Sequence, residues 1–288
     1  MSGEAITRPR ASSRAASAAM LPSVGLGTRL LLGDQCANVV HTAIDIGYRY
    51  VDTSPSYGNE DAVGRGVRLS GIDRHDMFVT TKVERDDLRP ERLLNSVQRS
   101  IDVLGLGWID LLLIHWPNAE VPFSETFSAM RALQQSGVVS HVGVANFPIA
   151  MLDEAMAAAN QAGTELFANQ IEVHPSLPQP RLVSACIARG VRPIAYSPMG
   201  REDLGHAAVL GVAGRIGRTP AQVILRWHIQ RAVLPAPIPD TGEPRQIASQ
   251  FDLFDFELSE DDMAVLSAVG PEKRYFSPAW APAWDPQD

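Results

Sequence analysis

Eight short runs rich in β-branched and aromatic residues recur along the chain, and stretches with helical spacing separate them. The runs lie at 24–28, 48–54, 77–83, 109–116, 140–147, 166–173, 192–198 and 233–239. In the stretches between them, apolar residues recur every three or four positions, and several stretches end on glycine, which favours the left-handed stop of a helix. A regular alternation of strand and helix predicts a parallel sheet covered by helices.

The number of runs decides between two forms of such a sheet. Eight strands favour a closed barrel over an open doubly wound sheet. The open form that binds dinucleotides carries G-x-G-x-x-G after its first strand, and "GLGTRLLLG" lacks the third glycine at the right place. No linker or change in composition divides the chain. We therefore predict a single-domain (β/α)8 TIM barrel over residues 21–288, preceded by a flexible N-terminal extension over 1–20.

Composition agrees with a globular protein and narrows the class of partner. Of the 288 residues, 45% are hydrophobic and 20% charged, which is enough apolar material for a large core. The formal net charge is −8, and both nucleic acid and an anionic membrane surface need a basic face instead. No apolar run reaches the roughly 18 residues that a membrane helix requires. We expect neither nucleic acid nor membrane as a partner.

The cysteines and the N-terminus bear on the compartment. Cys36 and Cys186 are too few for a disulfide framework or a zinc site, and we expect both to lie in the core of a protein from a reducing compartment. The segment "MSGEAITRPRASSRAASAAM" has no apolar centre, which argues against a secretory signal. Its Arg and Ser bias leaves a mitochondrial-type presequence open. We expect a cytoplasmic, monomeric protein.

Polar side chains stand where the apolar runs stop. Asp52 and Tyr57 end the second run, Lys82 the third and His115 the fourth. Each has an ordinary explanation: Asp52 as a turn former, Tyr57 as a pocket wall, Lys82 as a solvated side chain and His115 as a structural residue. The carboxyl ends of the strands in a parallel barrel meet on one face, however, and four complementary ionisable groups there indicate a site.

These four groups suit one kind of proton transfer. A phenol titrates near pH ~10, and an adjacent ammonium favours the phenolate and lowers that pKa. A carboxylate would hold the ammonium, and a histidine would orient a polarised oxygen. Together they would protonate an alkoxide as it forms from a carbonyl. The seven histidines show no H-x-H or H-E-x-x-H spacing, so we expect the reductant to be a dinucleotide rather than a metal centre.

From about Leu21 to Val269 the chain resembles the aldo-keto reductase superfamily, and within it the bacterial 2,5-diketo-gluconate reductase-like members. The motifs follow in the family's order: "LPSVGLGT", "GYRYVDTSPSYGNE", "FVTTKV", "IDLLLIHWP", "VGVANF", "NQIEVHP", "AYSPMG" and "TPAQVILRW". The resemblance implies an enzyme that reduces an aldehyde or ketone with NAD(P)H bound across the barrel mouth. It makes Tyr57 the general acid, has His115 orient the carbonyl, and has Lys82, held by Asp52, tune the phenol.

The resemblance also implies contacts to the cofactor and the substrate. The implied cofactor contacts are Gly27, Thr28, Asn146, Gln170, Tyr196, Ser197, Met199, Asp240, Thr241, Arg245, Gln246 and Gln250. The implied substrate contacts are Glu84, Arg85, Trp116 and Trp280. A C-terminal loop from about residue 270 would close over the substrate, or would instead be a proline-stiffened tail packed on the barrel. No residue is expected to bind a metal.

Departures from the family pattern affect two of these regions. "IPDTGEPRQIASQ" has Asp240 where the family has Lys and Gln246 where it has Arg. A carboxylate disfavours the 2′-phosphate of NADPH, so we lean to NADH although NADPH is the family default. Glu84 stands where the family has Trp, which makes that wall of the substrate pocket polar. Ala145 replaces a Ser.

A second function stays open at this point. The barrel would then bind a dinucleotide without turning it over and would serve as a regulatory or sensing subunit. The intact set of Asp52, Tyr57, Lys82 and His115 favours the enzyme, whose partner is a small carbonyl compound.

Overall fold

Eight parallel strands form one sheet in which each strand pairs with the next along the chain. The computed structural model describes residues 21–237 and 243–286, so the predicted extension over 1–20 lies outside the described residues. The strands are β1 (Leu26–Gly27), β2 (Tyr50–Asp52), β3 (Phe78–Val83), β4 (Ile109–Ile114), β5 (Val139–Ala145), β6 (Leu166–Glu172), β7 (Arg192–Tyr196) and β8 (Leu234–Pro235). All eight fall within the runs expected from the sequence or overlap them.

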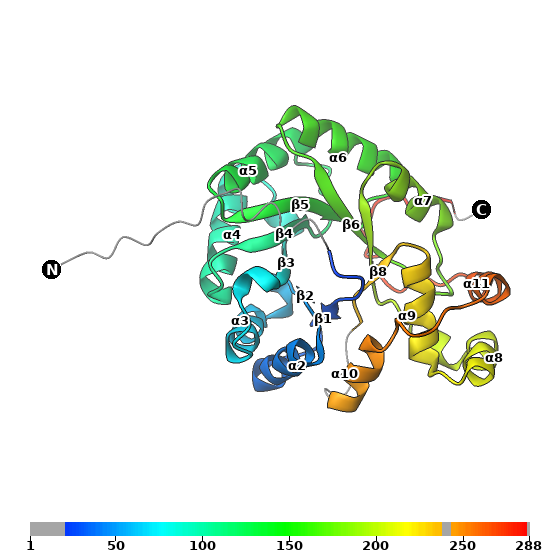
Figure 1. Cartoon of the computed structure of the whole chain (residues 1–288). Helices are drawn as coiled ribbons and strands as arrows, with labels where there is room; N and C mark the ends of the chain where they lie inside the picture. The colour runs from blue at the N-terminus through cyan, green and yellow to red at the C-terminus, as the bar shows by residue number, and fades with distance from the viewer. Residues whose placement is uncertain (1–20, 238–242, 287–288) are drawn as a thin grey trace.

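The sheet closes on itself. The backbone N–H of Gly25 donates to Pro235 O at 2.9 Å, and that of Gly27 donates to Pro237 O at 2.8 Å. These bonds join the segments of the first and last strands, so the sheet has no free edge there. The single-domain (β/α)8 barrel predicted from the sequence is confirmed (Figure 1).

Helices surround the ring of strands (Figure 1). Those of the described chain are α2 (Gly33–Ile46), α3 (Glu60–Leu69), α4 (Pro90–Leu104), α5 (Phe123–Gln135), α6 (Ile149–Gln161), α7 (Pro180–Ala188), α8 (Ala207–Ile216), α9 (Pro220–Gln230), α10 (Pro244–Phe251) and α11 (Glu260–Ser267). Helix α4 begins at Pro90 and stops at Gly105, which takes the left-handed conformation with φ 61°. Thr219 and Gln222 form a capping box on α9.

Two apolar clusters lie on the two faces of the sheet. Successive side chains of a strand point to opposite faces, so Leu111 and Leu113 of β4 join a small cluster while Leu112 and Ile114 join a large one. The large cluster packs between the sheet and the helices and includes both cysteines. The small cluster, with Tyr50 and other strand residues, fills the barrel interior. The polar side chains of Asp52, Lys82 and Glu172 lie at the carboxyl ends of their strands.

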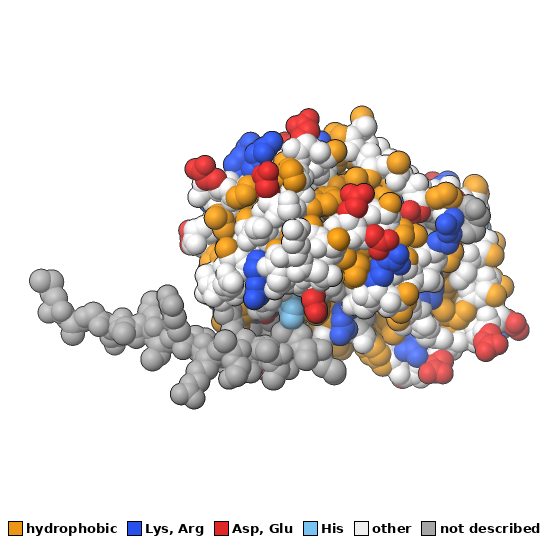
Figure 2. Space-filling view, turned by 90° about the horizontal axis from the view of Figure 1, so that it is seen from above, with side chains coloured by type: hydrophobic (Ala, Val, Ile, Leu, Met, Phe, Trp, Pro, Cys, Tyr) orange, Lys and Arg blue, Asp and Glu red, His pale blue; other side chains and the backbone are white. Residues whose placement is uncertain are grey.

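The surface is mixed in charge on the face seen in Figure 2, where acidic and basic side chains alternate with hydrophobic ones. Over residues 21–237 and 243–286, none of the helices has the length and apolar character needed to cross a membrane.

Candidate active site

The four ionisable groups predicted from the strand ends meet at the carboxyl end of the barrel. Asp52 is the last residue of β2, Lys82 lies in β3, and His115 follows β4 directly. Lys82 Nζ donates to Asp52 Oδ1 at 2.6 Å and to Tyr57 Oη at 3.3 Å. The rings of Tyr57 and His115 are edge to face, with centroids 6.1 Å apart. A phenol, an ammonium, a carboxylate and an imidazole therefore share one site.

A short turn brings Tyr57 back over the strands. Pro55 begins the 3-10 turn η1 (Pro55–Tyr57), and Gly58 ends it in the left-handed conformation with φ 64°. Proline presets the first angle of such a turn, and glycine takes a positive φ without a steric penalty. The Tyr57 ring then lies 4.9 Å from the Lys82 ammonium. The motif "SPSYG" thus forms a tight turn that places the Tyr57 phenol next to the end of β3.

Lys82 is 1% exposed, and its ammonium has three acceptors. They are Asp52 Oδ1, Tyr57 Oη and Thr53 O, the last at 2.9 Å. Burial lowers the pKa of Lys82, but Asp52 and Tyr57 raise it by more, and the net pKa lies above the usual value. The side chain is therefore a fixed positive charge inside the barrel.

The proton of Tyr57 is held more tightly than the sequence suggested. Burial raises the pKa of Tyr57, and this effect exceeds the lowering by the charge and hydrogen bond of Lys82. The expected effect of the ammonium is present, but desolvation outweighs it. Tyr57 therefore keeps its proton at neutral pH.

Asp52 and Gln170 bond to one another across the barrel. Gln170 Nε2 donates to Asp52 Oδ2 at 2.7 Å, and Tyr50 Oη approaches the same oxygen at 3.4 Å. Thr28 Oγ1 donates to the backbone oxygen of Asp52 at 2.8 Å, next to Gly27 at the end of β1. Two side chains expected at the cofactor, Gln170 and Thr28, thus also position Asp52.

Glu84 and His115 form a close pair. His115 Nδ1 lies 2.9 Å from Glu84 Oε1 and 3.1 Å from Oε2. Ser54 Oγ donates to Glu84 Oε1 at 2.6 Å. The sequence suggested Glu84 only as a polar wall of the substrate pocket. Its contact with His115 was missed, and so was Ser54, whose place in "DTSPSYG" gives no signal beyond a turn.

The ends of β5 and β7 carry strained backbone. Asn146 has φ 66° and Ser197 φ 47°, a region that side chains other than glycine seldom adopt. Asn146 Oδ1 accepts from Tyr196 Oη at 2.7 Å, and Asn146 Nδ2 donates to His115 O at 3.0 Å. Met199 is buried just beyond. Asn146 therefore connects three strand ends and holds the hydroxyl of Tyr196.

The adenosine end of the expected cofactor site is described only in part. Asp240 and Thr241 lie outside the described residues. Arg245 is exposed in the first turn of α10, and Gln246 beside it is half-buried. Gln250 is buried, and its Oε1 has no hydrogen-bond partner among the residues described. An unpaired buried acceptor fits an N–H donor such as the adenine amino group, so the residues present are compatible with a dinucleotide.

Aromatic side chains of the C-terminal segment lie against the loops of the barrel mouth. Trp280 meets the ring of Trp116 with centroids 5.1 Å apart, and the Arg85 guanidinium lies 5.3 Å from the Trp280 ring. Phe276 meets the ring of Tyr196 at 5.6 Å. This contact had no signal in the sequence.

One carboxylate of β6 fixes the C-terminal segment. Glu172 accepts from the backbone N–H groups of Tyr275 at 2.7 Å and of Phe276 at 3.0 Å. Glu172 is 1% exposed, and His174 Nε2 lies 3.1 Å from it. The segment after residue 270 is therefore tied to the barrel at a defined point.

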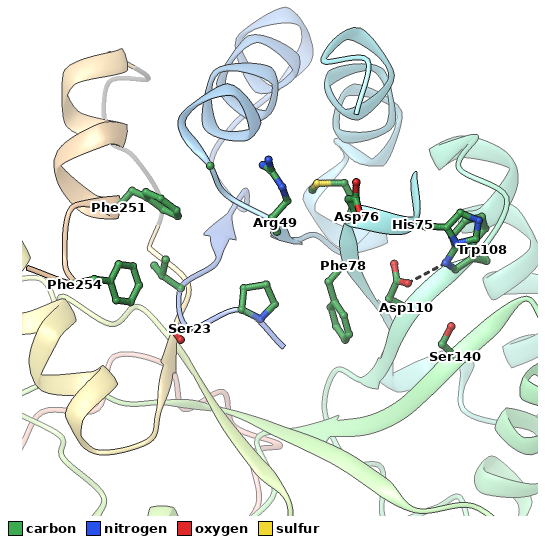
Figure 3. A pocket seen from close by; sticks show the side chains of 14 residues that line it. Ser23, Arg49, His75, Asp76, Phe78, Trp108, Asp110, Ser140, Phe251 and Phe254 are labelled. Atoms are coloured by element: carbon green, nitrogen blue, oxygen red, sulfur yellow. Dashed lines mark hydrogen bonds between the residues drawn. The ribbon is translucent and has the colours of Figure 1, made fainter. Parts of the chain in front are cut away.

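A cavity of about 350 Å³ lies at the opposite end of the barrel (Figure 3). Its lining includes Arg49, Met77 and Trp108, which precede β2, β3 and β4. Trp108 Nε1 donates to Asp110 Oδ1 at 2.9 Å within it. Asp52, Lys82 and His115 lie at the other ends of the same strands, so this cavity is separate from the ionisable cluster.

Residues 24–270 match the aldo/keto reductase family. The chain belongs to this family. It is 38% identical over 265 residues to an aldo-keto reductase of Mycobacterium sp. (strain KMS), which covers 89% of this chain and 94% of the relative. It is 36% identical over 277 residues to a morphine 6-dehydrogenase of Pseudomonas putida, with 88% and 91% covered.

Solved structures of the family agree in fold. One described as a putative 2,5-diketo-D-gluconic acid reductase B has a TM-score of 0.88 at 33% identity and covers 92% of this chain and 94% of its own. A Bombyx mori aldo-keto reductase in complex with NADP has a TM-score of 0.81 at 28% identity, with 90% and 92% covered. The protein is an aldo-keto reductase, an NAD(P)H-dependent carbonyl reductase.

Proposed function

We propose that carbonyl reduction takes place at the cluster of Asp52, Tyr57, Lys82 and His115, with Tyr57 as the general acid. The nicotinamide cofactor, when bound, supplies the hydride. The observation that carries the proposal is the buried Lys82 ammonium, whose Nζ reaches both Asp52 Oδ1 and Tyr57 Oη. A fixed cation 3.3 Å from the phenol stabilises the phenolate left after the proton has moved.

The proton path is short. Tyr57 Oη gives its proton to the substrate oxygen as negative charge develops there, and Lys82 stays charged because Asp52 holds it. His115, whose ring faces that of Tyr57, orients the same oxygen. The nicotinamide would be held beside this cluster, with Tyr196 and Gln170 as its contacts. Further contacts to the cofactor along the barrel mouth would come from Met199, Ser197, Gly27 and Thr28.

Tyr57→Phe tests this assignment. The variant keeps the ring and removes the proton donor, so turnover should fall by at least ~100-fold, the usual scale for a lost general acid. The Kd of the reduced cofactor should stay nearly unchanged. Tyr48→Phe is the matched control, since Tyr48 is a buried tyrosine whose hydroxyl approaches Ile247 O instead. Near-normal turnover of Tyr57→Phe on a panel of small carbonyls would overturn the role.

For the cofactor, we propose a small preference for NADH. Asp240 brings a carboxylate to the position where the family has a lysine, and like charges near a surface cost on the order of 1 kcal/mol, which is about tenfold in affinity. Arg245 and the first turn of α10 argue the other way, because a guanidinium and a helix N-terminus attract phosphate.

The experiment is the Kd of NADH and NADPH for wild type and for Asp240→Lys at fixed, moderate salt. Wild type should bind NADH more tightly, and the substitution should shift the ratio toward NADPH. Tighter binding of NADPH by wild type contradicts the proposal. An unmoved ratio in Asp240→Lys would mean that the residue does not face the ribose.

The substrate pocket is proposed to include Arg85, Trp116 and Trp280. Their mutual contacts beside the barrel mouth support this proposal. A guanidinium there favours a carbonyl substrate that carries a carboxylate or phosphate. A monomeric state, a cytoplasmic location, and the lack of nucleic-acid and membrane partners stay predictions.

A further inference from the structure

The register of two strands places Glu84 beside His115. Strands β3 and β4 are parallel, with Lys82 opposite Leu113 and Val83 opposite Ile114. Glu84 follows β3 directly and His115 follows β4 directly. The backbone N–H of His115 donates to Val83 O at 2.9 Å. The two side chains therefore leave the barrel next to each other, and both carboxylate oxygens lie within 3.1 Å of His115 Nδ1.

Glu84 is an acceptor and never a donor in this pair. Burial raises the pKa of Glu84, but hydrogen bonding to His115, the charge of that ring, and hydrogen bonds from Ser54 and Ser56 outweigh burial and lower the pKa to about 2. An ionised carboxylate has no proton to give. At working pH the proton between Glu84 and His115 must therefore sit on Nδ1 of the ring.

The other groups around the ring do not compete for this arrangement. Tyr57 faces it from η1, with the Lys82 ammonium and Asp52 behind the phenol. Asn146, from the end of β5, bonds only the backbone oxygen of His115. The Arg85 guanidinium is directed to Trp280 and Asn118. Ser54 Oγ lies 3.4 Å from Nδ1, but its own proton goes to Glu84 Oε1 at 2.6 Å. Among the charged groups of the described residues, Glu84 is the one that contacts a ring nitrogen of His115.

A fixed Nδ1 proton determines what Nε2 can do. The neutral ring then has a bare Nε2, which accepts a hydrogen bond, and only the doubly protonated ring has an Nε2–H that donates. A carbonyl oxygen accepts hydrogen bonds and cannot donate one. An alcohol hydroxyl can donate one.

We propose that Glu84 is a positioning residue that holds the Nδ1 proton of His115, so that the charged ring serves carbonyl reduction and the neutral ring serves alcohol oxidation. In reduction, the imidazolium Nε2–H donates to the carbonyl oxygen while Tyr57 transfers its proton, and the ring keeps both of its own. In oxidation, the bare Nε2 accepts a hydrogen bond from the alcohol hydroxyl, and the alcohol proton passes to the Tyr57 and His115 pair, which then holds one proton fewer than it does before reduction. This inference rests on the proposed function, in which His115 meets the substrate oxygen.

The direct test is the tautomer itself. Nitrogen NMR on ¹⁵N-histidine protein distinguishes a protonated from a bare ring nitrogen, and a His115→Gln variant assigns the signals. Wild type, once the ring is neutral, should carry its proton on Nδ1 and have a bare Nε2. In Glu84→Gln the neutral amide both donates and accepts, so the Nε2–H tautomer should become populated. A proton on Nε2 in neutral wild-type His115 overturns the proposal.

The pH profile is the second readout. Above the pH at which the ring loses its second proton, kcat/KM for reduction by wild type should fall about tenfold per pH unit, while oxidation rises over the same range. In Glu84→Gln, reduction and oxidation should no longer respond oppositely to pH, because the neutral ring of His115 can then donate through Nε2. A merely structural role for Glu84 would lower activity without reshaping the profile, and an unchanged profile in Glu84→Gln refutes the coupling.

Asp86→Asn is the matched control. It removes an exposed carboxylate two residues away that pairs with Arg85 at 3.3 Å and does not touch His115. It should keep the wild-type tautomer and profile, and a change like that of Glu84→Gln would mean that net charge alone is responsible. The NMR result does not depend on turnover. An active Tyr57→Phe would therefore remove the proposed function while leaving the tautomer assignment intact.

Discussion

Lys82 is a buried charge whose cost is offset by one partner in particular. Its ammonium is 1% exposed and lies 2.6 Å from Asp52 Oδ1. A buried pair of this kind is costly to break, since the remaining charge is left in a low-dielectric interior. Without Lys82, the side-chain donors left to the Asp52 carboxylate among the described residues would be Gln170 and Tyr50. The same ion pair therefore matters to the stability of the barrel and to the acidity of Tyr57.

Two variants separate these roles. Lys82→Met alone should lower the free energy of unfolding by about 3–5 kcal/mol, because it leaves the Asp52 carboxylate buried and unpaired. The double variant Asp52→Asn/Lys82→Met removes both charges and should regain most of that loss. Turnover should stay at least ~100-fold down in both, since neither stabilises the phenolate of Tyr57. Urea unfolding and an assay of cofactor oxidation check the two quantities. Recovery of turnover in the double variant would contradict the role of Lys82.

Helix α3 forms against the local propensity of its sequence. It contains Gly64 and Gly66, and glycine in a helix interior costs about 1 kcal/mol relative to alanine. The structure explains both: a Cβ on Gly64 would overlap Leu104 O of α4, and a Cβ on Gly66 would lie 2.6 Å from Val40 Cβ and 2.7 Å from Ala37 O of α2. Gly66 lets α2 and α3 approach closely, so packing between helices outweighs local propensity.

Alanine at two helical glycines should give opposite results. Gly66→Ala forces α2 and α3 apart and should destabilise the fold by about 1–3 kcal/mol. Gly211→Ala, in the interior of α8, places its Cβ in open space and should stabilise the fold by up to about 1 kcal/mol. Denaturant unfolding measures both. Equal effects of the two substitutions would show that the contact with α2 is not what requires Gly66.

The molecule as a whole is a closed sheet with two distinct apolar layers. The helices cover the outside, and the smaller cluster around Tyr50, Phe78 and Leu111 fills the inside. The ionisable cluster lies beyond this apolar filling, at the mouth where the strands end. The cavity of Figure 3 lies at the opposite end of the barrel. The C-terminal segment is part of this arrangement, because Glu172 bonds its backbone next to the cluster.

The sequence by itself determined the order of strands and helices and the set of ionisable residues at the strand ends. Both follow from local patterns: apolar periodicity sets the element, and the end of an apolar run sets where a polar side chain must leave the core. Helix ends could also be predicted from local residues, as shown by Pro90 and Gly105 at the two ends of α4.

The tertiary structure alone decided which of those side chains bond to each other. Glu84 and His115 are separated by 31 residues, and Asp52 and Gln170 by 118. The net pKa of Tyr57 likewise depends on burial, which its neighbours in the sequence do not specify. Partners of this kind are set by strand register and barrel closure, because these bring distant strand ends within hydrogen-bond distance and remove water from around them.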